Sequence, residues 1–160
     1  IKKGAYHCHL RFPELLYSHG LSPLPGEKIL IQVDTTSQGF PYQTENFLLN
    51  KFDVFTEIRV TPPDILLSQK IFAAVNRKRP KGRDFYDITF LSSRTKPNYD
   101  FLQMKLGIES KAQLKKELKS KFANYDFKTL AQDVAPFLMN QNEIKRVETF
   151  QQFWDQVNLG

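Results

Sequence analysis

The chain has 160 residues, a formal net charge of +6 and a pI of about 9.4. This length suits one domain or two small lobes that share a core, and 41% hydrophobic with 25% charged residues is the composition of a globular protein. The single cysteine, Cys8, excludes an intrachain disulfide and is typical of a reducing compartment. Because no apolar run reaches the roughly 18 residues of a membrane span, we expect a soluble protein of the cytoplasm.

The positive charge favours a polyanionic partner, such as RNA, DNA or the phosphates of a nucleotide. A charge that only keeps the protein soluble is the alternative. The 14 phenylalanines predict either an aromatic-rich core or a surface that leaves several rings exposed.

Three segments early in the chain have the patterns of strands. Residues 5–12 alternate between two faces, which is the period of a half-buried strand. Residues 14–19 predict a short helical turn that is closed by Gly20. Residues 28–36 and 53–60 are rich in β-branched side chains and predict two further strands.

From residue 61 onward the pattern becomes that of helices. Thr61 can cap a helix and Asp64 completes a capping box, so a helix is predicted from residue 62 to about Arg77. Further helices are predicted at 83–93, 98–106, 110–122, 127–139 and 143–157, with breaks at Gly107 and Asn140. Strands followed by helices predict an α+β fold, with a sheet lobe over residues 1–60 and a helical region over residues 61–160.

Two of these helices carry charged residues that need an explanation. The helix at 62–77 is apolar on almost all sides, so Lys70 within it must reach solvent, pair with acids or take part in function. Asp84 and Asp87 share a face near the N-terminus of the next helix, where the helix dipole favours carboxylates. They can hold Lys70 in place or act on the hydroxyl of a reactant, and Arg83 can pair with Asp87. A purely structural network of ion pairs between the two helices is the alternative.

The segment between these helices is strongly basic, since five of the seven residues at 77–83 are cationic. Arg77, Lys81 and Arg83 are therefore candidate contacts for phosphate groups. A solvated run of charges is the alternative.

The first strands carry candidate metal ligands. Asp34 lies near the end of the strand at 28–36 and can help to hold magnesium if other acids lie nearby; a plain strand-end aspartate is the alternative. His7 and His9 share a strand face, which is compatible with metal binding, but no third ligand is identifiable and Cys8 points the other way.

These features, in this order, resemble the AbiEii/AbiGii-type nucleotidyltransferase toxins. The resemblance rests on the segment 69–74 (Gln-Lys-Ile-Phe-Ala-Ala), on Arg77, and on the Arg-Asp-x-x-Asp motif at 83–87, together with the strand that carries Asp34. It covers residues 28–95 and, more loosely, the helical tail.

The resemblance implies a partial polymerase-β-like nucleotidyltransferase fold, in which a mixed sheet is followed by a helical C-terminal region. It also implies a toxin of a toxin–antitoxin or abortive-infection system that uses a nucleoside triphosphate (NTP) and magnesium (Mg²⁺). Some members modify tRNA, and the cognate antitoxin is a partner. By this resemblance Lys70 neutralises triphosphate charge, Asp84 or Asp87 positions or deprotonates the attacking hydroxyl, and Asp34 is a metal-facing carboxylate.

The chain departs from the family pattern at one point. The family's early motif is a Gly-Gly or Gly-Ser turn followed by Asp-x-Asp on a strand, and no Asp-x-Asp occurs in this sequence. That motif supplies the main metal ligands. We therefore expect either that an N-terminal segment is missing from this chain or that the protein is a degenerate relative, and that the chain alone does not transfer nucleotides.

Two readings without catalysis remain open. One is a basic module that binds RNA through the cationic loop. The other is an interaction protein whose helical tail, around Phe150, Phe153 and Trp154, docks an antitoxin; ordinary core packing of Trp154 is the alternative to that role.

Overall fold

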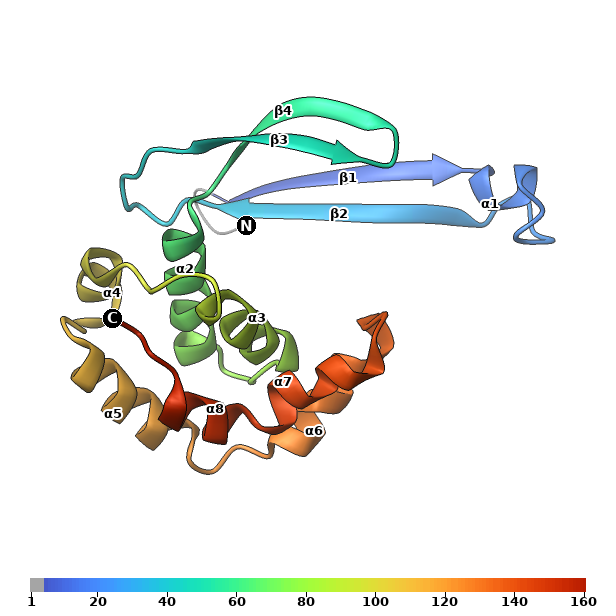
Figure 1. The fold of residues 1–160 in the computed structure, drawn as a ribbon. Coiled ribbons are helices and arrows are strands. Elements are labelled where there is room, and N and C mark those ends of the chain that lie inside the picture. Colours follow the sequence, from blue (N-terminus) through green and yellow to red (C-terminus); the bar gives the residue numbers. More distant parts are fainter. Residues whose placement is uncertain (1–4) are drawn as a thin grey trace. The chain divides into compact units, whose positions relative to one another are not determined.

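The structure is a computed structural model that describes residues 5–160, over which it contains four strands and a series of helices (Figure 1). The α+β class predicted from the sequence is confirmed. By their internal contacts the residues form two compact units, Ile1–Phe40 and Pro41–Gly160. The secondary structure changes from strand to helix after Val60, close to the expected change at residue 61.

The first unit is a hairpin in which β1 (Ala5–Pro13) pairs antiparallel with β2 (Lys28–Thr36). The short helix α1 (Leu15–Ser18) lies in the connection, and Gly20 follows it with a φ of 67°, in the region that favours glycine. The side chains expected on the buried face of β1 are 40–72% exposed: Tyr6, Leu10 and Phe12. The prediction of a half-buried strand is therefore wrong for this hairpin, because within its unit no second layer covers it.

The second unit begins with another antiparallel hairpin, formed by β3 (Glu45–Lys51) and β4 (Val54–Val60). The turn residues Phe52 and Asp53 have φ values of 51° and 60°, both positive as in a type I′ turn. The sequence did not reveal β3, because Phe-Asp is not the Asn-Gly or Asp-Gly pair that signals such a turn.

The two hairpins are separate two-stranded sheets. Over residues 5–160 every strand pair is antiparallel.

The first helices of the second unit are α2 (Pro63–Asn76), α3 (Gly82–Ser92) and α4 (Tyr99–Leu106). The predicted cap of α2 is wrong, because the side chains of Thr61 and Asp64 have other partners. The hydroxyl of Thr61 lies 3.1 Å from that of Tyr42, and Asp64 accepts a hydrogen bond of 3.0 Å from the amide of Asn98. Asn98 also caps α4, and its link to Asp64 ties the start of α2 to the start of α4.

The later helices are α5 (Lys111–Phe122), α6 (Phe127–Gln132), α7 (Lys145–Glu148) and α8 (Phe150–Gln156), with 3₁₀ turns η1 (Ala135–Phe137) and η2 (Gln141–Ile144). The expected helix at 127–139 is shorter, since Pro136 has no N–H to continue the ladder and sits in η1. The expected helix at 143–157 is divided at Thr149, whose ψ of 20° leaves the helical range.

The core of the helical part is aromatic. The Phe85 ring is fully buried and packs edge-to-face, at centroid distances of 4.9–5.0 Å, against three rings: Phe122, Phe127 and Phe150. Both predicted outcomes of the high phenylalanine content therefore occur: some rings form the core, and others, among them Phe55 and Phe137, remain exposed. Over the described residues, no helix combines the length and the apolarity that crossing a bilayer requires.

Candidate functional site

The candidate site lies on the surface shared by α2 and α3. These helices pack against each other, so a residue in the middle of α2 meets the first turns of α3. The Lys70 amine lies 2.7 Å from the Asp87 carboxylate, and each side chain is 33% exposed. The expectation that Lys70 is held by an acid of the neighbouring helix is thus met by Asp87, and the pair remains open to solvent.

The second acid of the motif has a different environment. Asp84 is 3% exposed at its side chain and accepts from Arg77, at 2.7 Å from Nε and 3.4 Å from the second guanidinium nitrogen. The expectation that both acids hold Lys70 is therefore confirmed for Asp87 and wrong for Asp84. Two cation–carboxylate pairs thus join α2 and the residue that follows it to the first turns of α3: Lys70 with Asp87, and Arg77 with the buried Asp84.

Close packing fixes the end of the basic loop at Gly82. A Cβ atom added to this glycine would lie 1.9 Å from the backbone oxygen of Leu130 in α6 and 2.8 Å from a methyl carbon of Val134. Only glycine allows this approach. Because Arg77 is tied to Asp84 at the other end of the loop, the basic segment is anchored at both ends.

The cations of this loop differ in their partners. Arg77 is engaged by Asp84, and Lys81 lies 3.9 Å from Asp133. Within residues 5–160, the side chains of Lys78, Arg79 and Arg83 form no ion pair. The expected pair between Arg83 and Asp87 is therefore not formed, because Asp87 is bound to Lys70 instead.

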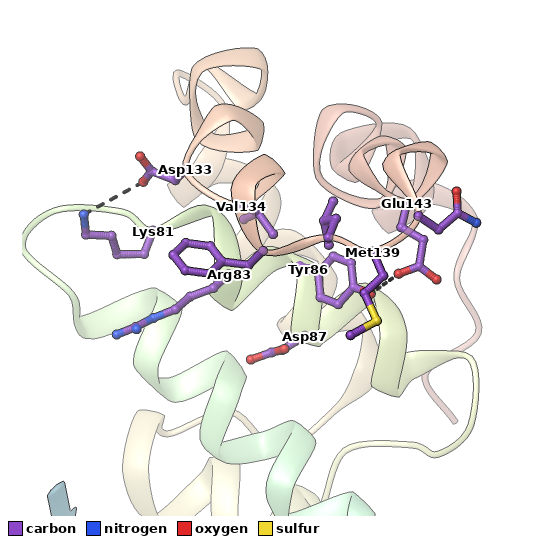
Figure 2. Close-up of a pocket in the computed structure, with 11 residues that line it drawn as sticks. Lys81, Arg83, Tyr86, Asp87, Asp133, Val134, Met139 and Glu143 are labelled. Carbon is purple, nitrogen blue, oxygen red and sulfur yellow. Dashed lines mark hydrogen bonds and ion pairs between the residues drawn. The ribbon is translucent and has the colours of Figure 1, made fainter. Parts of the chain in front are cut away.

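A pocket of about 870 Å³ opens beside α3 (Figure 2). Its floor is one face of α3, where Tyr86 and Asp87 lie about one helical turn after Arg83. Its rim is formed by the segment from Asp133 to Glu143, and Lys81 closes one end. The sequence patterns gave no sign of this rim, since it is built by long-range packing.

Tyr86 and Glu143 are pocket residues that the sequence reading missed. The Tyr86 hydroxyl donates a hydrogen bond to the Glu143 carboxylate, although the two residues are 57 positions apart. This bond, with burial as the second cause, raises the pKa of Tyr86 above its ordinary value. The phenol therefore stays protonated at neutral pH and holds η2 against α3.

Asp34 lies in the first unit, where its partner is a histidine. Its carboxylate is 2.6 Å from Nδ1 of His7, directly across the β1–β2 ladder, and also accepts from the Gln32 amide. These hydrogen bonds, that to His7 first, lower the pKa of Asp34 below its ordinary value. In the part of the chain that the structure describes, no group of three metal-ligating side chains occurs. The residues around Asp34 by themselves thus do not fit a magnesium site, which needs several oxygen ligands.

The helical tail does not form the exposed docking surface that one alternative required. Phe150 is 1% exposed and Trp154 is 3% exposed, and their stacked rings lie 5.6 Å apart in the core. The core reading of Trp154 is confirmed.

The α+β fold agrees with the class of nucleotidyltransferases to which the sequence motifs pointed. The family model described as "Nucleotidyl transferase AbiEii toxin, Type IV TA system" matches residues 4–155. The chain therefore belongs to this family of toxins. A comparison with curated proteins and one with solved structures gave no match. Membership implies an NTP as substrate and an antitoxin as partner, and such enzymes generally use a divalent metal.

Proposed function

We propose that this chain is the C-terminal portion of a nucleotidyltransferase toxin that transfers a nucleotide from an NTP to an acceptor, with tRNA as the candidate acceptor. In this proposal residues 1–60 belong to the sheet lobe of the enzyme, and residues 61–160 form the helical region that handles phosphate. The observation that carries the proposal is the half-exposed Lys70–Asp87 pair, 2.7 Å apart, beside a basic loop in which Lys78, Arg79 and Arg83 form no ion pair with any residue of 5–160.

Lys70 is suited to binding the triphosphate. Its amine is one-third exposed and approaches the solvent beside Asp87, so phosphate oxygens can reach it. A lysine ammonium is a compact point charge, the kind of group that neutralises phosphate charge in phosphoryl transfer. The exposed Arg83 supplies a second cation, while Arg77 and Lys81 contribute positive potential from either end of the loop.

Asp87 is suited to act on the attacking hydroxyl. When the triphosphate binds Lys70, the Asp87 carboxylate is free to accept the proton of an acceptor hydroxyl. That oxygen forms a bond to the α-phosphorus, and the bond from this phosphorus to the bridging β-phosphate oxygen breaks, so that pyrophosphate leaves. Asp84 is the less suitable base, because both of its oxygens face Arg77 and its side chain is buried. We assign to Asp84 the positioning of Arg77.

Two features support the proposal that this chain is inactive alone. The sequence contains no Asp-x-Asp, the motif on which the family's metal site depends. The hairpins leave large apolar side chains exposed, among them Leu30, Val33 and Phe47, as expected of sheets whose faces are covered by a further layer of the enzyme. Asp34 can serve as a magnesium ligand only if other parts of the enzyme bring further carboxylates to it, so no step of the reaction is assigned to the metal.

Binding of inorganic tripolyphosphate tests the role of Lys70. Lys70→Ala should weaken binding about tenfold, since a charge-assisted contact is lost. Asp87→Asn should leave binding intact or strengthen it, because it removes an opposing charge. Lys119→Ala is the matched control, since Lys119 forms a similar pair with Asp155, at 2.8 Å, elsewhere on the helical part. Equal losses for Lys70→Ala and Lys119→Ala would show that only net charge matters.

A transfer assay tests the inactivity of the chain. With a labelled NTP, magnesium and tRNA, we expect no incorporation above background. Incorporation by this chain that disappears in Lys70→Ala would contradict the proposal, because the 160 residues of this chain would then suffice for catalysis.

A non-catalytic RNA-binding module is the second candidate. The exposed cations Lys78, Arg79 and Arg83 favour it, since none of them is neutralised by an ion pair within the described residues. This candidate predicts RNA affinity that falls steeply with salt and survives Asp87→Ala.

A further inference from the structure

We propose that the pocket beside α3 is the nucleobase site: the base of the NTP lies against Phe137 and Tyr86, and its phosphates extend toward Arg83 and Lys81. This inference rests on the proposed function, and it assigns the other half of the substrate to residues outside the Lys70–Asp87 pair. The volume of about 870 Å³ lies within the range of small-molecule pockets, roughly 300–1,000 Å³.

The two ends of the pocket differ in chemistry. Figure 2 shows Lys81 and Arg83 at one end, and Tyr86, Met139 and Glu143 at the other. A nucleotide has the same polarity, with a flat aromatic base at one end and anionic phosphates at the other. Because Arg83 and Lys81 lie at the basic end, the orientation that places the phosphates at that end is favourable.

The lining of the pocket carries three carboxylates and two cations, but neighbouring cations offset the carboxylates and leave Arg83 available for phosphate. Three carboxylates line it, and each has a cation nearby: Lys70 lies at 2.7 Å from Asp87, Lys81 at 3.9 Å from Asp133, and Arg146 at 3.9 Å from Glu143. Among the charged residues of the pocket, Arg83 alone has no ion pair within residues 5–160. An anion that enters therefore meets one uncompensated guanidinium, which is the side chain best shaped for phosphate.

The apolar side chains at the rim of the pocket are exposed to solvent and are not packed into the core. Phe137 is 83% exposed and Met139 is fully exposed, although both line the pocket. The segment is nevertheless held in shape, because the Gln141 amide donates to the backbone oxygens of Ala135, at 3.2 Å, and Leu138, at 3.0 Å. An exposed aromatic ring on a held backbone segment beside a pocket is available to stack on a nucleic-acid base.

The ring of Tyr86 is oriented for the same purpose. Its hydroxyl is fixed by Glu143, and its ring stacks on Phe90 with 10° between the planes and 6.3 Å between the centroids. The phenol therefore cannot swing into the pocket or out of it without breaking both contacts, and it offers a rigid wall.

NMR titration of the ¹⁵N-labelled chain tests this site, with ATP, GTP, CTP, UTP and inorganic tripolyphosphate as probes. Phe137→Ala should weaken the binding of at least one NTP about tenfold, since one stacking contact is lost, and should leave tripolyphosphate binding unchanged. Arg83→Ala should weaken the binding of both kinds of ligand. Phe55→Ala is the matched control, because Phe55 is 70% exposed on β4 and does not line the pocket.

The outcomes separate this inference from the function on which it rests. If tripolyphosphate binds and Phe137→Ala changes no NTP affinity, or lowers the affinity for tripolyphosphate equally, the nucleobase site is overturned while the phosphate role of Lys70 stands. If neither NTP nor tripolyphosphate binds at millimolar concentration, both proposals fail.

Discussion

Large apolar side chains are exposed on the hairpin β1–β2 but form a buried core among the helices α2–α8. The helices enclose a core in which Phe85, Phe101 and Phe150 are at most 1% exposed. The hairpin has alternating apolar residues of similar size, but Tyr6 and Leu10 remain 72% and 46% exposed. The difference shows that apolar patterning produces burial only where a second layer is present.

The helical part and the hairpins also differ in the features that they contribute to the protein. The helical part contains its own core, and it holds the Lys70–Asp87 pair and the pocket on a supported framework. The hairpins contribute exposed strands and the Asp34–His7 pair. Three pairs of variants test this difference between the two regions.

The largest difference should be between two phenylalanines. Phe85→Ala should lower the free energy of unfolding of the helical part by about 3–5 kcal/mol, because it leaves a cavity among buried rings. Phe55→Ala should lower it by less than about 1 kcal/mol, because that ring is largely in solvent. Urea unfolding followed by the fluorescence of Trp154, the single tryptophan, reports on this core. Similar losses for both variants would show that the β3–β4 hairpin, which carries Phe55, is part of the same core.

An intermediate difference is expected between the two aspartates of the motif. Asp84→Ala should destabilise the helical part by about 2 kcal/mol, because it leaves Arg77 without its buried partner. Asp87→Ala should cost less than about 1 kcal/mol, as for exposed ion pairs. Thermal unfolding of both variants measures the contrast. If Asp87→Ala were the more destabilising, the half-exposed pair would be structural, and the catalytic role proposed for Asp87 would lose its support.

The smallest effect concerns the pKa of Asp34. This pKa is lowered in the folded hairpin, mainly by the hydrogen bond with His7. The stabilisation is therefore present above the unfolded pKa of about 3.9 and is lost as the pH falls through the folded pKa. In His7→Val, the pKa of Asp34, measured by carboxyl ¹³C NMR, should rise toward its ordinary value. The control His19→Val, at an exposed position after α1, should leave it unchanged.

The sequence predicted those parts of the fold that depend on near neighbours in the chain. The helix of Lys70, the helix of Asp84 and Asp87, and the breaks at Gly107 and Asn140 agree with the structure to within a few residues. It failed where the signal was weak or misleading: at β3, whose turn carries an unusual Phe-Asp pair, and in the last helices, which Pro136 and Thr149 interrupt.

By itself the sequence determined the class of the fold and the family, and it identified Lys70 and the Arg-Asp-x-x-Asp motif, because periodicity and motif spacing are local properties. The pairing of the charges, Asp87 with Lys70 and Asp84 with Arg77, depends on how the helices pack. The tertiary structure also created the pocket, which joins Tyr86 to Glu143 across 57 positions. The physical reason is that side chains far apart in the sequence become neighbours only when the core of the helical part brings their helices together.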